Sequence, residues 1–222
     1  MPFAECWQLQ ERYFAELSDY KLALRKGLAD VSQAIPGKLL FVEHPHVFTL
    51  GKSGDEKNLL LSQHSLQKID AEFFPINRGG DITYHGPGQL VGYPIIDLEQ
   101  YFTDIHKYLR YLEEAIIMML KNFGIEAGRI QGLTGVWIDA ELPGKARKIA
   151  AMGVKCSRWI TMHGFALNVN PNLSYFQHIV PCGITDKAVT SMEAELGETV
   201  DLEQVKKLVK ENLAELFGFE YH

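Results

Sequence analysis

A glycine-rich segment holds the densest set of residues that could do chemistry. Residues 78–93 read Arg-Gly-Gly-Asp-Ile-Thr-Tyr-His-Gly-Pro-Gly-Gln-Leu-Val-Gly-Tyr. Glycine lets the backbone approach a ligand closely and adopt φ values that other residues avoid. Arg78 adds a planar set of hydrogen-bond donors, and polar side chains follow at Thr83, Tyr84 and His85. The pattern favours a ligand-binding loop over its alternative, a tight structural hairpin.

Cys182 is the second chemically suggestive residue. It stands between Pro181 and Gly183, a setting that suits a loop better than a packed core. A nucleophilic cysteine reacts as its thiolate, and an ordinary thiol with a pKa of about 8.5 is only slightly ionised at neutral pH. A nearby cation would favour the thiolate. Lys148 and His163 are the candidates upstream, and their spacing from the cysteine does not choose between them.

The other two cysteines are weaker candidates. Cys6 lies beside Trp7 on an expected strand, which is typical of a buried structural thiol. Cys156 lies at an expected strand end beside charged residues, so exposure gives it some chance of reactivity. Three cysteines without paired spacing argue against a disulfide framework or an ordinary zinc site, and free thiols fit a reducing compartment.

Two further patterns resemble binding motifs but lack essential parts. Residues 51–53, Gly-Lys-Ser, resemble the end of a phosphate-binding loop, yet the required first glycine is replaced by His46 and a turn follows instead of a helix. His44 and His46 flank a proline and have no acidic or cysteine partner nearby, which favours a loop over a metal pair. We therefore expect no nucleotide, no metal and no other cofactor.

Apolar periodicity and capping residues predict the helices. An amphipathic stripe predicts a first helix over residues 18–32, and a short helix is expected near Ser65. Asp104 can cap a helix that ends near residue 122, with Gly124 as its stop. A final helix is expected between Asp201 and Gly218.

The strand pattern indicates the fold class. The expected strands cover residues 39–43, 47–50, 73–77, 89–98, 135–139, 148–156 and 160–169, with a short strand at 83–85. Strands in hairpins, interrupted by a few helices, predict an α+β fold with a mixed, mostly antiparallel sheet flanked by helices. The alternation is too irregular for a Rossmann fold. The length of 222 residues suits a single domain, residues 1–222.

Composition narrows the functional classes. A net charge of −6 argues against general nucleic-acid binding, which needs a basic surface. The sequence has no apolar stretch near the ~20 residues of a membrane span and no recognisable signal peptide, so a cytoplasmic protein without membrane association is expected. Within this acidic chain one segment is basic; its cations are Lys145, Arg147, Lys148, Lys155 and Arg158. It suggests an acidic partner, with a solvated hairpin as the alternative.

The glycine-rich segment resembles the signature of lipoyl(octanoyl) transferases, within the biotin/lipoate ligase superfamily. Four other segments match motifs of this family in the family's order: residues 43–51, 147–153, 163–170 and 181–183. The matches cover about residues 39 to 192. The resemblance implies a fold similar to the biotin/lipoate protein ligase catalytic domain.

The resemblance also implies a reaction. Such enzymes take octanoyl from acyl carrier protein and deliver it to a lysine of lipoyl domains, in 2-oxoacid dehydrogenases and in the glycine cleavage H protein, as the first step of protein lipoylation. By position, Cys182 matches the cysteine that accepts the acyl group, and Lys148 matches the lysine thought to lower its pKa. The position of His46 is often proline in the family, with little expected consequence.

The family's acyl pocket maps onto three segments of this chain. The residues expected to bind substrate are Arg78, Gly79, Gly80, Asp81, Ile82, Thr83, Tyr84, His85, Ala151, Met152, Gly153, Gly164, Phe165 and Ala166. Because acyl carrier proteins are strongly acidic, four cations of the basic segment become candidates to steer docking: Lys145, Arg147, Lys155 and Arg158. Lys148 is expected to point inward instead.

Two alternatives remain beside the transferase. An ATP-dependent lipoate-protein ligase would share the fold, but it forms an acyl-adenylate and needs no cysteine. A protein that only binds acyl groups would keep the pocket and make Cys182 dispensable. The cysteine and the form of the glycine signature favour the transferase.

Overall fold

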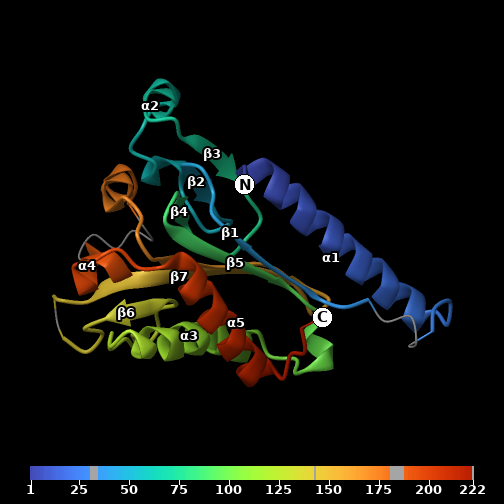
Figure 1. The fold of residues 1–222 in the computed structure, drawn as a ribbon. Coiled ribbons are helices and arrows are strands. Elements are labelled where there is room, and N and C mark those ends of the chain that lie inside the picture. Colours follow the sequence, from blue (N-terminus) through green and yellow to red (C-terminus); the bar gives the residue numbers. More distant parts are fainter. Residues whose placement is uncertain (31–34, 143, 181–187, 222) are drawn as a thin grey trace.

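A six-stranded sheet runs through the middle of the molecule (Figure 1). The computed structural model describes residues 1–30, 35–142, 144–180 and 188–221. The sheet has the order β1-β5-β8-β7-β6, and β9 pairs with β7. Its strands are β1 (Lys38–Val42), β5 (Gln89–Ile95), β8 (Ile160–Asn168), β7 (Arg147–Ser157), β6 (Val136–Ile138) and β9 (Ala188–Val189).

A smaller sheet stands beside the central one. Its strands, in the order β3-β2-β4, are β3 (Glu72–Pro75), β2 (Val47–Leu50) and β4 (Ile82–His85). Neighbouring strands in both sheets are antiparallel, apart from β2 with β3 and β7 with β9, which are parallel. The predicted mixed, mostly antiparallel α+β architecture is therefore confirmed.

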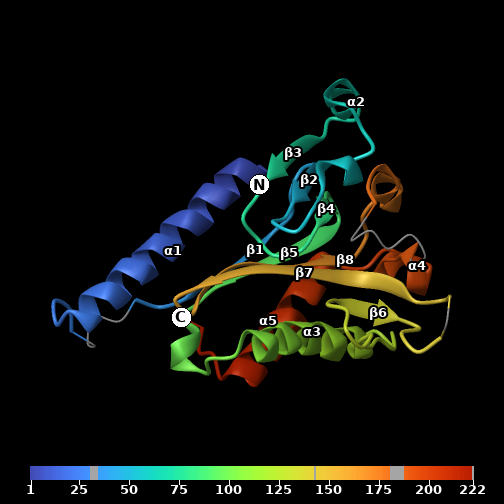
Figure 2. The same ribbon diagram turned by 180° about the vertical axis from the view of Figure 1, so that it is seen from behind.

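Helices cover the two faces of the central sheet differently. α3 (Ile105–Asn122) and α5 (Leu202–Phe217) lie on one face, while α1 (Phe3–Arg25) and the small sheet lie on the other (Figures 1 and 2). The shorter helices are α2 (Gln63–Lys68), α4 (Met192–Leu196) and the 3-10 turns η2 (Glu56–Asn58), η3 (Leu98–Gln100) and η4 (Leu173–His178). No helix in the described part of the chain is long and apolar enough to cross a membrane.

The predicted caps of two long helices are confirmed. The Asp104 side chain accepts hydrogen bonds from the backbone N–H groups of His106 and Lys107 at the start of α3. Asp201 accepts from Glu203 at the start of α5, which ends at the left-handed Gly218. These bonds satisfy N–H groups that lack a partner within the helix. The inward stripe of α3 then packs into the main core, with Tyr108, Leu112, Ile116 and Leu120 fully buried.

The predicted first helix is wrong in position. α1 begins at Phe3 and ends at Arg25 instead of covering residues 18–32; of that range, residues 31 and 32 lie outside the described residues. Cys6 consequently lies on a helix and not on a strand, although it is buried as expected. The buried stripe of α1 includes the polar Gln10 and Lys21, which obscured its periodicity in the sequence.

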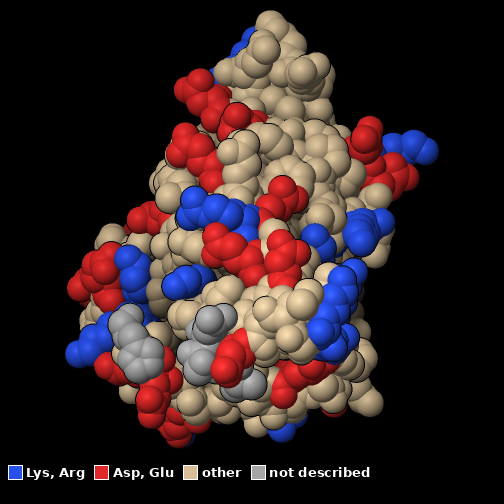
Figure 3. Space-filling model, turned by 90° about the vertical axis from the view of Figure 1, so that its right-hand side faces the viewer, with Lys and Arg blue, Asp and Glu red and all other residues tan. Residues whose placement is uncertain are grey.

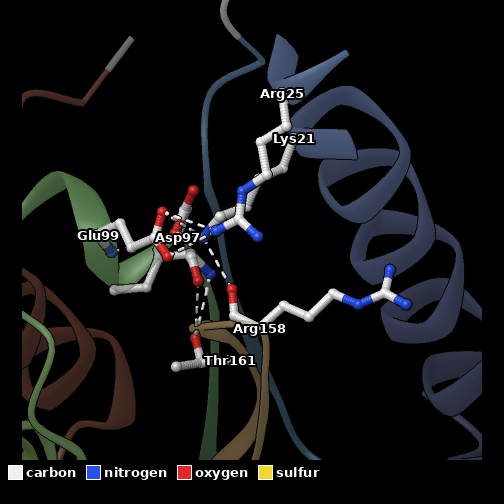
Figure 4. Close-up of polar contacts among 7 residues, drawn as sticks. Lys21, Arg25, Asp97, Glu99, Arg158 and Thr161 are labelled. Atoms are coloured by element: carbon white, nitrogen blue, oxygen red, sulfur yellow. Dashed lines mark hydrogen bonds and ion pairs between the residues drawn. The ribbon is translucent and has the colours of Figure 1, made fainter. Parts of the chain in front are cut away.

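An ion-pair cluster fastens the C-terminal half of α1 to the sheet (Figure 4). Lys21 donates to the Asp97 carboxylate at 2.6 Å and to the Arg158 carbonyl at 2.7 Å, and its ammonium lies 3.1 Å from Glu99. Arg25 pairs with Glu99 at 3.0 Å. The cluster joins α1 to the turn after β5 and to the β7–β8 hairpin, so it holds the helix across the strand ends.

Candidate active site

A cavity of about 360 Å³ adjoins β5, β7 and β8 and is also lined by residues of the small sheet, of α1 and of the segment 132–134. The structure brings nearly all the predicted substrate-binding residues to its walls. Those that line it are Arg78, Gly79, Gly80, Asp81, Ile82, Thr83, His85, Ala151, Met152, Gly153, Gly164, Phe165 and Ala166. Segments far apart in the sequence therefore meet at one site.

Tyr84 is the predicted pocket residue that lies outside the lining. Its side chain is fully buried in the small sheet, where the hydroxyl hydrogen-bonds to Nδ1 of His46 at 2.7 Å. Its ring stacks on Tyr175 with 5.0 Å between centroids. On β4 the side chains of Thr83 and Tyr84 point to opposite faces of the strand, and of these two only Thr83 lines the cavity.

Small residues on neighbouring strands form part of the cavity wall. Ala151 pairs with Ala166, and Gly153 pairs with Gly164, across β7 and β8. A Cβ on Gly164 would lie 2.1 Å from the Gly92 carbonyl oxygen, and one on Gly153 would lie 2.8 Å from Cδ of Arg78. Glycine is thus required at both positions by close packing, and the small side chains leave room for a narrow apolar ligand.

Arg78 brings a buried positive charge to the cavity. Its Nη2 donates to the Thr49 carbonyl at 2.7 Å and to the Thr49 hydroxyl at 3.0 Å, while Nη1 donates to the Gly79 carbonyl at 3.0 Å. These bonds tie the glycine-rich loop to β2. The guanidinium is therefore held rigidly, with its alkyl stem lying across Gly153.

Two histidines in the cavity wall are uncharged at neutral pH. His85 donates from Nδ1 to Gln89 Oε1 at 2.7 Å, and burial, with the nearby charge of His44, lowers its pKa to about 3. His163 contacts Asn77 Oδ1 through Nε2 at 3.0 Å, and burial, with the charge of Arg78, lowers its pKa to about 3 as well. His163 thus supplies no cation at neutral pH.

Lys148 lines the cavity, as expected from its predicted inward orientation. It pairs with Trp137 across β6 and β7, and its Nζ lies 4.6 Å from the centroid of that ring. On its other side it pairs with Val189 of β9, and its carbonyl accepts from the Thr190 N–H at 3.0 Å. Strands on both sides therefore fix the backbone that carries this lysine.

Glu113 supports the wall beside Lys148 and was not identified from the sequence. This fully buried carboxylate accepts from the Gly135 N–H at 2.9 Å and from Arg129 at 2.8 Å, and it pairs with Arg110 at 2.7 Å. A Cβ on Gly135 would lie 3.3 Å from Cε of Lys148, so this glycine packs directly against the lysine side chain. In the sequence, the position of Glu113 directly after the inward-facing Leu112 was the available sign that this carboxylate is buried.

The basic segment does not form one cluster in space. Arg147 is paired with Asp139 and, at 2.5 Å, with Glu195, so its charge is locally balanced. Lys145 and Arg158 flank opposite ends of β7, whose 11 residues span roughly 33 Å at about 3.3 Å per residue. Figure 3 shows one face of the molecule on which acidic and basic side chains are interspersed.

Cys182 lies outside the described residues, as do Pro181 and Gly183. The chain on either side of them is described. Val180 donates its N–H to the Asn58 carbonyl at 2.9 Å, and Phe176, at the preceding 3-10 turn η4, lines the cavity. On the other side, Val189 also lines the cavity. Both flanks of the segment that carries Cys182 therefore adjoin the cavity.

The described residues give no sign of a metal centre, since none of their His, Cys, Asp and Glu side chains form a group of three or more that could hold an ion. His44 and His46, the pair flanking Pro45, have different partners. His44 contacts Tyr93 and the Met1 carbonyl, whereas His46 contacts Tyr84. His44 thus contacts a residue of the cavity lining, whereas His46 packs against aromatic residues outside it.

Residues 4–214 match the family model for the lipoyl protein ligase A/B catalytic domain. The chain belongs to this family. An octanoyltransferase of Cytophaga hutchinsonii is 61% identical over 97% of this chain and 88% of its own length. An octanoyltransferase of Bacteroides thetaiotaomicron is 47% identical over 98% of this chain and 92% of its own length. Relatives of this similarity thus extend over nearly the whole chain.

Solved structures of the family share the fold. The bipartite lipoate protein ligase of Thermoplasma acidophilum has a TM-score of 0.68 and 16% identity, over 95% of this chain and 81% of its own. A lipoate-protein ligase A bound with ATP has a TM-score of 0.65 and 18% identity, over 85% of this chain and 76% of its own. The predicted ligase-like fold is therefore confirmed.

Proposed function

We propose that this chain is an acyltransferase that moves an octanoyl group from acyl carrier protein to a lysine of lipoyl domains. The acceptors would be lipoyl domains of 2-oxoacid dehydrogenases and the glycine cleavage H protein. The observation that carries the proposal is the 61% identity to an octanoyltransferase over 97% of the chain. The cavity and its small-residue wall support it, because they offer space for a narrow apolar chain.

The first half of the reaction would be a thioester exchange at Cys182. The thiolate attacks the carbonyl carbon of the octanoyl thioester, the bond to the carrier sulfur breaks, and the carrier thiol leaves with a proton. This exchange is close to isoenergetic because one thioester replaces another. In the second half, the neutral amine of the acceptor lysine attacks the Cys182 thioester, loses a proton and forms an amide while the thiol is released. Amide formation is downhill, so neither half requires a nucleotide.

Lys148 would stabilise the thiolate form of Cys182. β9 begins six residues after that cysteine and pairs with β7 at Arg147 and Lys148, so the chain returns directly to the lysine. Six residues span at most roughly 20 Å, a reach that permits contact between the two side chains. An ammonium close to a thiol lowers the thiol's pKa and raises the reactive fraction at neutral pH.

A nucleotide-free transfer assay tests the proposal. The purified chain is mixed with octanoyl-acyl carrier protein and an unmodified lipoyl domain, and the mass of the domain is followed. We expect the domain to gain one octanoyl group without ATP, and we expect Cys182→Ser to abolish the gain. Transfer that requires ATP and free lipoate would instead identify a ligase. If no transfer occurs under either condition, the proposal is overturned, and a protein that only binds acyl groups is the remaining alternative.

A further inference from the structure

The cavity extends across the central sheet. Lys148 on β7 and Trp137 on β6 line it on one side, and Tyr93 on β5 and Phe3 on α1 line it on the other. β8 lies between β7 and β5, so these two strands are separated by two interstrand spacings, or roughly 10 Å. The cavity therefore has a lysine end and an α1 end.

Phe3 closes the α1 end with an aromatic ring. The side chain is only 1% exposed and lines the cavity. Its ring stacks nearly parallel to that of His85, with 6.4 Å between centroids, and packs against Phe74 at 5.2 Å and Trp7 at 6.1 Å. Because the ring is buried, packed against these neighbours and part of the lining, removing it would add space at this end of the cavity.

Hydrogen bonds next to Phe3 keep this wall in place. His44 donates from Nδ1 to the Met1 carbonyl at 2.9 Å, and its Nε2 accepts from the Tyr93 hydroxyl at 2.8 Å. Burial lowers the pKa of His44 to about 4, so the ring is neutral and can accept on one nitrogen while donating from the other. The start of α1 is thereby tied to β5, a strand of the cavity wall.

We propose that Phe3 is the specificity-determining residue that limits the length of the acyl chain. This inference rests on the proposed function. The acyl carbonyl has to lie near Lys148, where the chain that follows Cys182 returns to β7. The hydrocarbon tail then extends away from Lys148, across β8 and β5, and its methyl end meets the Phe3 ring.

A competition between acyl chains tests the role of Phe3. The protein is incubated with equal amounts of hexanoyl-, octanoyl-, decanoyl- and dodecanoyl-acyl carrier protein, and the acyl adducts are read from its intact mass. Because each methylene accommodated in an apolar pocket changes selectivity by about 10-fold or more, Phe3→Ala should raise the dodecanoyl-to-octanoyl ratio at least about 10-fold. Phe3→Leu should raise it less, and Phe3→Trp should favour hexanoyl.

Phe48→Leu provides a matched control. Phe48 is fully buried in the small sheet but is absent from the cavity lining, so this variant should keep the wild-type ratio. If Phe3→Ala does not fold by circular dichroism, Phe3→Leu and Phe3→Trp decide the outcome. Wild-type chain selectivity in all folded Phe3 variants would overturn the inference alone. Failure of the wild type to accept any acyl group would instead overturn the proposed function.

Discussion

The two ends of the cavity are built from different kinds of interaction. At the lysine end, paired strands hold Lys148, and the buried carboxylate of Glu113 holds the adjoining Gly135. At the α1 end, Phe3 and neutral histidines form the wall, and the charged contacts of α1 lie further along the helix at Lys21. The lysine end is suited to stabilising a negative charge, whereas the α1 end is suited to selecting a ligand by its length. Substitutions at the two ends should therefore change different observables.

The largest effect is expected at the lysine end. With Lys148→Ala, acylation at pH 7 should slow about 10- to 100-fold, because loss of a neighbouring cation raises a thiol's pKa by about one to two units. The rate–pH profile should shift to higher pH, and Lys148→Arg should restore part of the rate. Stopped-flow acylation across pH 6–9 measures both. Phe3→Leu should leave the rate–pH profile unchanged. An unshifted profile in Lys148→Ala would contradict the proposal that the lysine end stabilises charge.

An intermediate effect is expected from acid at the α1 end. The pKa of His44 is lowered to about 4, and the pKa values of His85 and His163 to about 3, mainly by burial. The unfolded state therefore binds more protons below the ordinary histidine pKa of about 6.5, so stability present above that pH is lost as pH falls toward 4. The loss should be about 1 kcal/mol per histidine between pH 6.5 and 5.5.

Urea unfolding at several pH values measures this loss. His44→Gln should reduce the pH dependence of the free energy of unfolding by the contribution of one buried histidine. His64→Gln, at an exposed position, should leave that dependence unchanged. A free energy of unfolding that stays constant from pH 7 to pH 5 would show that the α1 end is not built around neutral histidines.

The smallest effect is expected from surface charge. Lys145 precedes Lys148 by three residues, whereas Arg158 follows the far end of β7. Lys145→Glu should raise the apparent KM for acyl carrier protein about two- to five-fold and reduce its salt dependence, because rim charges mainly affect encounter. Arg158→Glu should change either quantity less. If Arg158→Glu raises the apparent KM more than Lys145→Glu does, acyl carrier protein docks at the other end of β7.

The sequence was sufficient for elements with clear local signals. Asp104, Asp201 and Gly218 mark helix ends because capping is a short-range interaction. α1 was misplaced because its buried face includes Gln10 and Lys21, whose partners lie on β8 and in the turn after β5. Tertiary hydrogen bonds and ion pairs thus replaced the apolar stripe on which the prediction depended.

The site could be predicted only in part for a related reason. The family motifs located most of the cavity wall, since those residues are contiguous in each segment. Phe3 and Glu113 reach the site through packing of α1 and α3, which no local spacing encodes. The basic segment suggested a cluster of cations because its residues are close in sequence. In the structure an extended strand separates them.

The central claim is that Cys182 carries the acyl group, and locating the adduct tests it most directly. The protein is incubated with octanoyl-acyl carrier protein without nucleotide, then digested, and its cysteine peptides are analysed by mass spectrometry. Burial raises the pKa of Cys6 to about 11 and also raises that of Cys156, so these thiols serve as internal controls. We predict a hydroxylamine-labile octanoyl group on Cys182 alone. No adduct, or an adduct on Cys156 that persists in Cys182→Ser, would contradict the claim.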